Sequence, residues 1–258
     1  MSQDAIHARL ARELGLTVGQ VERCVALLDE GNTVPFIARY RKEATGEMDE
    51  TQIRTLQERL AYLRNLEAEK EKVLRVLAEQ GKLTPELERA IREAEKLQEV
   101  EDLYRPYRPK RRTRAMIARE RGLEPLAQQM LAQAETAGSP EQIAATYVNP
   151  ELGVASAEEA LAGARDIVAE IVSDDAAVRK MARELTFARG VIRSAAGDRG
   201  DPEKALEFEM YFDFQEPVRP LPPHRILALN RGERLECLKV TLEAPAEELI
   251  AGIERQYI

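Results

Sequence analysis

The chain has 258 residues, 44% hydrophobic and 33% charged, which is enough for one large domain or two ordinary ones with real cores. Its longest unbroken apolar run, Cys24 to Leu28, is far shorter than the roughly 18 residues that a membrane span requires. The first residues mix charged and apolar side chains and contain no apolar signal core. These features predict a cytoplasmic protein with no membrane partner.

The N-terminal pattern predicts two short helices. Apolar side chains recur at intervals of three and four residues after Thr17, a predicted N-cap. Pro35 opens a second helix that we expect to reach Gly46, since proline suits a first helical turn and glycine a helix end. Residues 18–46 therefore predict a helix-turn-helix, within a first segment that spans residues 1–48.

Helical spacing continues through a second predicted segment, residues 49–190. Its longest pattern, over residues 50–80, includes a polar stretch with charge pairs that favour one continuous solvated helix. A Thr-Pro pair at Pro85 begins another helix, and capping boxes at Ser139 and Ser156 begin two more. Further helices are expected near Thr113, near Pro125 and from Asp174 to Arg189.

The third predicted segment, residues 191–258, mixes helices with strands. We expect a short strand at 191–194, a helix at 203–211, and a proline-bearing connection after it. Two strands, 226–230 and 235–242, are expected to form a hairpin whose turn contains a glycine. The fold class predicted overall is mainly α, an elongated multi-helical bundle with an N-terminal helix-turn-helix and a small C-terminal β-ribbon.

Catalytic and metal-binding residues are scarce. Only His7 and His224 could serve a histidine-based relay, and neither has a motif around it; we expect His7 on the surface and His224 at the start of a strand. Cys24 and Cys237 lack a CxxC spacing and are interpreted as core thiols. Nucleotide-binding glycine motifs are also absent. The sequence therefore predicts a protein that is not an enzyme and has no metal and no cofactor.

The strongest positive signal is a basic segment. Residues 104–121 hold eight Arg and Lys but only one acidic residue, in a chain whose net charge is −8. Guanidinium groups suit phosphate oxygens, and tyrosine rings can stack on unpaired bases. Two prolines should keep the segment extended or turned. The predicted nucleic-acid-binding residues here are Tyr104, Arg105, Tyr107, Arg108, Lys110, Arg111, Arg112 and Arg114.

A second, smaller group consists of Arg39, Arg41 and Lys42, in the second helix of the expected helix-turn-helix. These cations could face a groove or phosphates. In the alternative interpretation Phe36, Ile37 and Tyr40 form the buried stripe and the cations are simply solvated. The 104–114 segment has an alternative too, because its cations could pack on acidic helices of the same chain or on a protein partner.

Several stretches resemble one family. They read LLDEGNTVPFIARYRKEATGEMDE, QGKLTPELERAI, EDLYRPYRPKRRTRAMIARERGLEPLA, LAGARDIVAEI and, near the end, YFDFQEP followed by PPHRILALNRGE. In this order they are similar to the N-terminal part of the bacterial Tex proteins, which are transcription accessory factors.

The resemblance implies an elongated, mostly helical cytoplasmic protein associated with transcription and RNA metabolism. Tex proteins continue into an RNase H-like domain, helix-hairpin-helix motifs and an OB-fold RNA-binding domain, so these C-terminal domains are implied partners. Nuclease chemistry would belong to such an absent domain. The resemblance also implies that strands at 225–242 form the edge of a larger core, and it places Arg105 where relatives carry an aliphatic residue.

The sequence thus leaves two functions open. One is a helical scaffold that makes sequence-independent contacts with the phosphate backbone of RNA or DNA. The other is an architectural module that docks on the transcription machinery and binds no nucleic acid itself.

Overall fold

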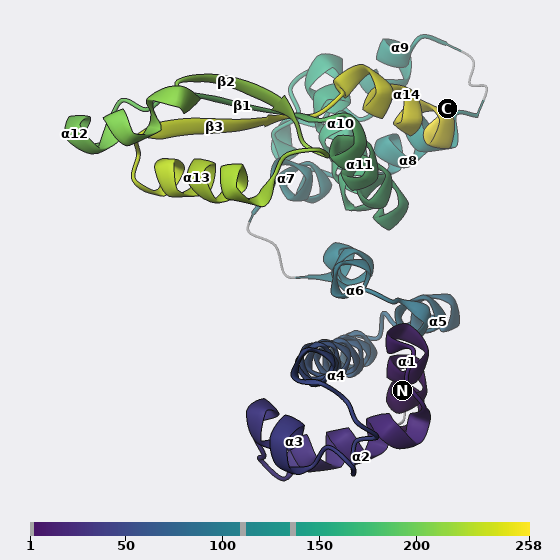
Figure 1. Ribbon diagram of the computed structural model, residues 1–258. Coiled ribbons are helices and arrows are strands. Elements are labelled where there is room, and N and C mark those ends of the chain that lie inside the picture. The colour runs from purple at the N-terminus through teal and green to yellow at the C-terminus, as the bar shows by residue number, and fades with distance from the viewer. Residues whose placement is uncertain (1–2, 109–111, 135–137) are drawn as a thin grey trace. The chain divides into compact units, whose positions relative to one another are not determined.

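The computed structural model describes residues 3–108, 112–134 and 138–258 (Figure 1). The chain forms two compact units, residues 1–107 and 108–258. It is mainly α-helical, as the sequence predicts, with one small sheet in the second unit. The finer division into residues 1–48, 49–190 and 191–258 stays a prediction.

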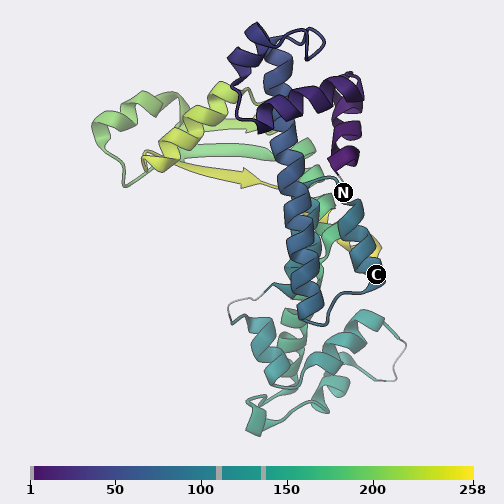
Figure 2. The same ribbon diagram turned by 90° about the horizontal axis from the view of Figure 1, so that it is seen from below.

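The first unit is built on one long helix. Its elements are α1 (Gln3–Leu14), α2 (Val18–Asp29), α3 (Val34–Tyr40), α4 (Glu50–Glu79), α5 (Pro85–Glu93), α6 (Leu97–Tyr104) and the 3-10 helix η1 (Arg105–Tyr107). α4 is continuous through its polar stretch, and α2 and α3 lie beside the end where it begins (Figure 2). Thr17 and Asp49 close full capping boxes at the starts of α2 and α4.

The core of this unit collects apolar faces from all its α-helices. Leu10, Val21, Ile53 and Leu63 are among its fully buried side chains. His7 belongs to this interior as well: it is buried, and neither ring nitrogen has a hydrogen-bond partner among residues 3–108, 112–134 and 138–258. The prediction of a surface His7 is therefore wrong, because α1 turns the face that carries it toward α2 and α4.

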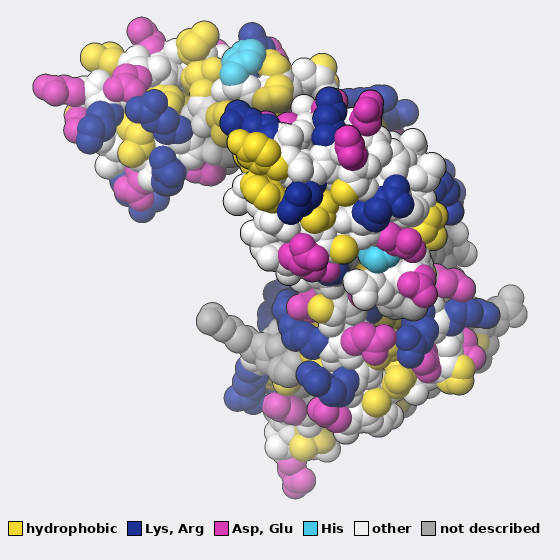
Figure 3. Space-filling model, turned by 60° about the horizontal axis from the view of Figure 1, so that its bottom comes forward, with side chains coloured by type: hydrophobic (Ala, Val, Ile, Leu, Met, Phe, Trp, Pro, Cys, Tyr) yellow, Lys and Arg dark blue, Asp and Glu magenta, His cyan; other side chains and the backbone are white. Residues whose placement is uncertain are grey.

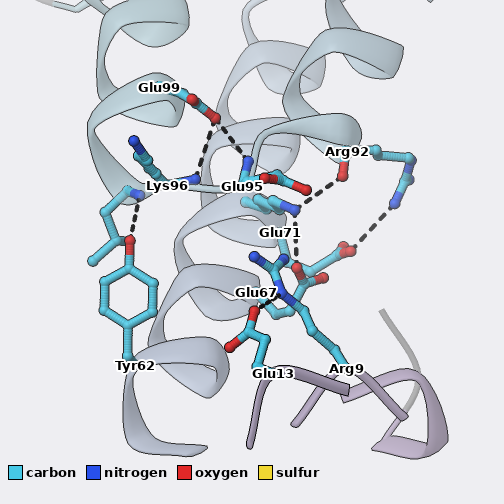
Figure 4. A network of polar contacts seen from close by, with 11 residues as sticks. Arg9, Glu13, Tyr62, Glu67, Glu71, Arg92, Glu95, Lys96 and Glu99 are labelled. Atoms are coloured by element: carbon cyan, nitrogen blue, oxygen red, sulfur yellow. Dashed lines mark hydrogen bonds and ion pairs between the residues drawn. The ribbon is translucent and has the colours of Figure 1, made fainter. Parts of the chain in front are cut away.

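Polar contacts fasten α5 and α6 to α4 (Figure 4). The buried Lys70 ammonium lies 3.0 Å from Glu67 Oε1 and donates a 2.9 Å hydrogen bond to the carbonyl of Arg92 at the end of α5. The Tyr62 hydroxyl accepts a bond from the amide of Leu97, where α6 begins. A lysine inside the stretch expected to be solvated thus satisfies a helix end in the interior.

A carboxylate joins α1 to α4. Glu13 accepts hydrogen bonds from Arg59 Nε at 2.6 Å and from Arg9 Nε at 2.7 Å. The Arg59 bond, opposed by burial and supported by Arg9, lowers the pKa of Glu13 to about 2. This ion pair therefore helps to hold α1 in place at neutral pH.

The second unit begins with helices that surround α10. Its helical elements are α7 (Arg114–Glu120), α8 (Glu124–Ala132), α9 (Pro140–Ala145), η2 (Pro150–Leu152), α10 (Ala157–Asp174), α11 (Ala176–Arg189), α12 (Pro202–Ala205), η3 (Leu206–Tyr211), α13 (Pro223–Arg234) and α14 (Ala246–Tyr257). Leu123, Leu126, Ala164 and Ile167 are buried where α7, α8 and α9 pack on α10.

An antiparallel sheet of order β2-β1-β3 follows, formed by β1 (Val191–Ala196), β2 (Asp213–Pro217) and β3 (Leu238–Glu243). In the middle strand, Ser194 is opposite Phe214 on one side and Val240 on the other. Phe208, Tyr211, Leu229 and Leu238 form the core between the sheet, η3 and α13. β2 lies in the stretch that was expected to be only a connection.

The predicted strand at 226–230 is wrong, because this stretch lies inside α13. Pro223 stands in the first turn of that helix, so it favours the helix instead of ending a connection, and His224 is helical too. Gly232 makes no hairpin turn: a Cβ at this position would lie 2.5 Å from Leu238 Cδ1. The glycine lets α13 pack closely on β3.

Asp175, the N-cap of α11, helps to hold α14 on that helix. Asp175 caps α11 by accepting bonds from two backbone amides, and it also accepts 2.7 Å and 3.0 Å bonds from Tyr257 and Gln256. Burial opposes the charged form, but these bonds together keep the pKa of Asp175 below its usual value. Burial, with Asp175 beside the ring, raises the pKa of Tyr257 to about 12.

Candidate nucleic-acid interface

α3 carries two opposite faces. Val34 and Ile37, three residues apart, are buried against the first unit. Phe36 and Tyr40 lie on the other side, with 36% and 67% of their surface exposed. The expectation that Phe36 and Tyr40 join Ile37 in a buried stripe is therefore wrong, and only Ile37 of the three points inward.

The two exposed rings form a pair. Phe36 and Tyr40 are one helical turn apart, and their ring centroids are 5.3 Å apart with the planes tilted by 43°. The Arg41 guanidinium lies over the Phe36 ring, 5.7 Å from its centroid. This is a cation–π contact, which fixes the direction of a long side chain without neutralising its charge.

The second helix of the expected helix-turn-helix is shorter than predicted. α3 ends at Tyr40, so Arg41 and Lys42 lie in the turn that leads to Gly46. The assignment of a helix-turn-helix motif to residues 18–46 stays a prediction.

This turn is fixed to α2. Arg23 Nε donates a 2.6 Å bond to the carbonyl of Ala44, and Gln20 Nε2 donates a 3.1 Å bond to that of Gly46. Thr45 is fully buried, and its hydroxyl donates to the carbonyl of Lys42 at 3.0 Å. The backbone that carries the exposed side chains of this turn is therefore fixed by hydrogen bonds from α2.

The cations of this region have no carboxylate partners among the residues that the structure describes. Arg39, Arg41 and Lys42 are exposed, and within the described ranges no Asp or Glu oxygen comes within 4.0 Å of their charged groups. Glu43 is the one acidic residue in the stretch 36–43, which keeps a net charge of +2. We call the surface formed by Phe36, Arg39, Tyr40, Arg41 and Lys42 the α3 patch.

The tyrosines of the 104–114 segment pack inward. Tyr104 ends α6 and Tyr107 ends η1, and both rings are partly buried against the core of the first unit. The Lys82 ammonium is 6.0 Å from the Tyr107 ring centroid. A segment expected to be extended or turned thus begins as a helix end and a single 3-10 turn.

The described cations of this segment have partners. Arg112 Nη2 is 2.8 Å from Glu120 Oε2, and Arg114 Nη2 is 3.5 Å from Asp166 Oδ1. Arg105 and Arg108 also take part in polar or ring contacts. Lys110 and Arg111 lie outside the described residues.

Charges of both signs are interspersed on the face drawn in Figure 3. In the described ranges no cluster of three or more His, Cys, Asp and Glu side chains is arranged to hold a metal ion. Nor does any helix there have the length and apolar character for crossing a membrane.

Comparison with known proteins identifies the family. Residues 4–78 match the Tex-like protein N-terminal domain, and residues 135–257 match the Tex central region-like domain. The chain belongs to the Tex family. It is 51% identical to protein tex of Bordetella pertussis over 245 residues, which cover 94% of this chain and 30% of that protein.

Two further relatives carry informative names. The transcriptional accessory protein Tex of Neisseria gonorrhoeae is 44% identical over 248 residues, 96% of this chain and 32% of its own length. The S1 RNA-binding domain-containing protein 1 of Pongo abelii is 30% identical over 223 residues, 84% of this chain and 22% of its own length. The Tex-family chain spans about a third of the length of the curated bacterial relatives it matches.

Sequence reasoning placed the cations of the α3 patch among its site residues but missed the aromatic pair. Phe36 and Tyr40 have the i, i+4 spacing of neighbours on one helix face, and cations at positions 39, 41 and 42 surround that face. That combination of spacing and charge was the available signal for an exposed pair. It could not decide between the stripe that contains Phe36 and the one that contains Val34.

Proposed function

We propose that this Tex-family chain binds nucleic acid without sequence preference, through phosphate contacts made by the α3 patch. The observation that carries the proposal is that Arg39, Arg41 and Lys42 are exposed together and have no carboxylate partner in the part of the chain that the structure describes. Guanidinium and ammonium groups bind phosphate oxygens through charge-assisted hydrogen bonds, and contacts to the nucleic-acid backbone carry no base information.

The helix dipole offers a simpler explanation for the same cations, and the proposal has to account for features that this explanation does not cover. Positive side chains at the end of a helix stabilise its dipole by about 0.3–1 kcal/mol. That effect concerns the last turn of α3 and requires neither a fixed turn beyond it nor exposed rings beside it. The names of the relatives, one a transcriptional accessory protein and one named for an RNA-binding domain, add support for a nucleic-acid ligand.

A salt titration tests the proposal. The double variant Arg39→Gln with Lys42→Gln removes, from exposed positions, two charges that no described carboxylate neutralises. Its affinity for RNA or DNA should fall roughly 10- to 50-fold at 0.1 M salt, and the slope of log K against log salt should decrease by up to about two. The matched control is Arg112→Gln with Arg114→Gln, which removes two charges that have carboxylate partners.

Two outcomes contradict the proposal. One is a wild-type chain that fails to bind oligonucleotides even at low salt. The other is a slope that the α3 variant leaves unchanged while the control variant reduces it, because the phosphate contacts would then lie in the 104–114 segment.

A second function is favoured by that segment. The contacts of Arg112 with Glu120 and of Arg114 with Asp166 favour an architectural role, since these charges lie beside carboxylates of the second unit. The family's link to transcription makes a protein of the transcription machinery the partner for such a module. A pull-down of RNA polymerase with the wild type and with both double variants separates this function from nucleic-acid binding.

A further inference from the structure

The exposed Phe36–Tyr40 pair is the feature of the first unit that phosphate binding leaves unexplained. Single apolar side chains on a surface are ordinary, and Phe187 on α11 is one, with 58% of its surface exposed. Phe36 and Tyr40 differ because two rings touch each other and adjoin three cations that have no carboxylate partner among the described residues. A protein partner with an apolar surface would have to desolvate those charges, whereas a nucleotide offers them a phosphate.

We propose that Phe36 and Tyr40 form a stacking platform for an unpaired base, so that the α3 patch selects single-stranded nucleic acid. This inference rests on the proposed function and adds the class of ligand. A nucleotide joins a flat apolar base to a phosphate, and the patch places flat rings beside cations in the same way. Single-strand-binding surfaces in general combine aromatic side chains with a positive groove.

The two rings have different roles. Arg41 covers Phe36, whose exposure is about half that of Tyr40, so Tyr40 presents the more accessible ring. Phe36 supports Tyr40 from one helical turn away, and a base that stacks on Tyr40 lies next to Arg39 and Arg41 along the chain. The phosphate of the same nucleotide then falls among the cations of the patch.

Stacking of this kind discriminates between strands. In a duplex each base is already covered by its neighbours and paired through its edge, so it has no free face for Tyr40. An unpaired base has such a face whatever its identity, and the platform is therefore tolerant of sequence.

Rigidity lowers the cost of binding. α3 is anchored by the buried Val34 and Ile37, and the following turn is held by Arg23 and Gln20. The rings and at least the backbone of the cations thus need little ordering when a ligand arrives.

The first experiment compares Tyr40→Ala with Tyr40→Phe in the full chain. Affinity for a single-stranded 12-mer of deoxythymidine should fall roughly 5- to 150-fold in Tyr40→Ala. It should stay within about twofold of wild type in Tyr40→Phe, which keeps the ring. Affinity for a duplex of equal length should change little in both variants, and a thermal melt confirms that Tyr40→Ala is folded.

The second experiment uses the fact that the chain contains no tryptophan. Tyr40→Trp introduces a single indole at the platform, and Phe187→Trp introduces one at a matched exposed position on α11 of the second unit. The deoxythymidine 12-mer should quench the fluorescence of Tyr40→Trp and leave Phe187→Trp unchanged. An abasic strand of the same length, which has phosphates but no bases, should bind without quenching.

The outcomes separate this inference from the proposed function. Salt-dependent binding that is equal for the abasic and base-bearing strands, and that survives in Tyr40→Ala, overturns the stacking platform and leaves phosphate binding intact. Absence of any oligonucleotide binding by the wild type overturns both.

Discussion

The cations of the two basic stretches of the chain have different surroundings. In the α3 patch the described charges have no carboxylate partner and the aromatic rings are exposed. In the 104–114 segment Arg112 and Arg114 lie beside carboxylates, and Tyr104 and Tyr107 pack on the core. The 104–114 segment has the higher density of positive charge, yet its described cations already have partners in the chain. Charge density in a sequence is therefore a poor guide to which cations a ligand can reach.

The largest effect is expected from removing the anchor of the α3 patch. Ile37→Ala deletes fully buried atoms on the inner face of α3 and should lower the free energy of unfolding by about 3 kcal/mol. Tyr40→Ala, on the opposite face of the same helix, should lower it by less than about 1 kcal/mol. Urea denaturation measures both. Equal losses would mean that the Tyr40 ring is buried and that the contrast between the two faces of α3 is false.

The stability that the partly buried ion pair of Arg59 with Glu13 contributes can be compared with that of the exposed ion pairs in the 104–114 segment. Glu13→Gln removes the carboxylate that receives Arg59 and Arg9, and should lower the free energy of unfolding at pH 7 by about 1–2 kcal/mol. Calorimetry at neutral pH measures the loss, and Glu58→Gln, an exposed position on α4, serves as the control.

The same ion pair predicts a pH dependence. Folding lowers the pKa of Glu13 from 4.5 to about 2, so its contribution is complete above about pH 4.5 and disappears as the pH falls toward 2. The stability difference between wild type and Glu13→Gln should shrink across this window. A difference that stays constant from pH 6 to pH 2 would show that the carboxylate's charge contributes nothing.

Rigidity of the turn beside α3 can be tested at Gly46, whose φ is +68°. Gly46→Ala introduces a Cβ in the left-handed region, 2.9 Å from Gln20 Nε2, and should cost about 1 kcal/mol or slightly more. Gly31→Ala is the matched control, because its φ is +85° and no atom lies within 4 Å of the new Cβ. Comparison of the two melts isolates the Gln20 contact. An identical loss in both variants would show that Gln20 does not hold the turn.

The smallest expected effects on stability come from comparing one cation of each basic stretch. Arg112→Gln removes a partner from Glu120, yet both side chains are largely exposed, so its loss of stability should stay below about 0.5 kcal/mol. Arg39 has no ion pair or side-chain hydrogen bond with any described residue, so Arg39→Gln should leave the melting temperature unchanged. A clear destabilisation by Arg39→Gln would indicate that this cation serves the fold.

The sequence predicts most of the helices because their caps and periodicity are local. The side chains of Thr17, Thr84, Thr113 and Ser139 all cap the helices expected to follow them. Strands in the last segment are harder to predict, since β1 pairs with partners far along the chain, and the stretch at 226–230 suits either state. Its position in α13 depends on packing against the sheet, with Gly232 at the close contact.

The candidate site was only half predictable. The cationic residues follow from composition, but their availability depends on long-range contacts such as that between Arg114 and Asp166, 52 positions apart in the chain. Which face of α3 is buried depends likewise on α2 and α4, and no spacing within seven residues can supply that information.

The two cysteines have a practical consequence. Cys24 and Cys237 are the chain's only thiols, both are buried, and burial raises the pKa of Cys24 to about 11. Maleimide dyes should therefore leave the native protein unmodified. A cysteine introduced by Glu43→Cys, an exposed position beside the α3 patch, and another by Lys180→Cys on α11 can then be labelled selectively. Energy transfer between the dyes would follow, in a single molecule, the distance between the two units as an oligonucleotide binds.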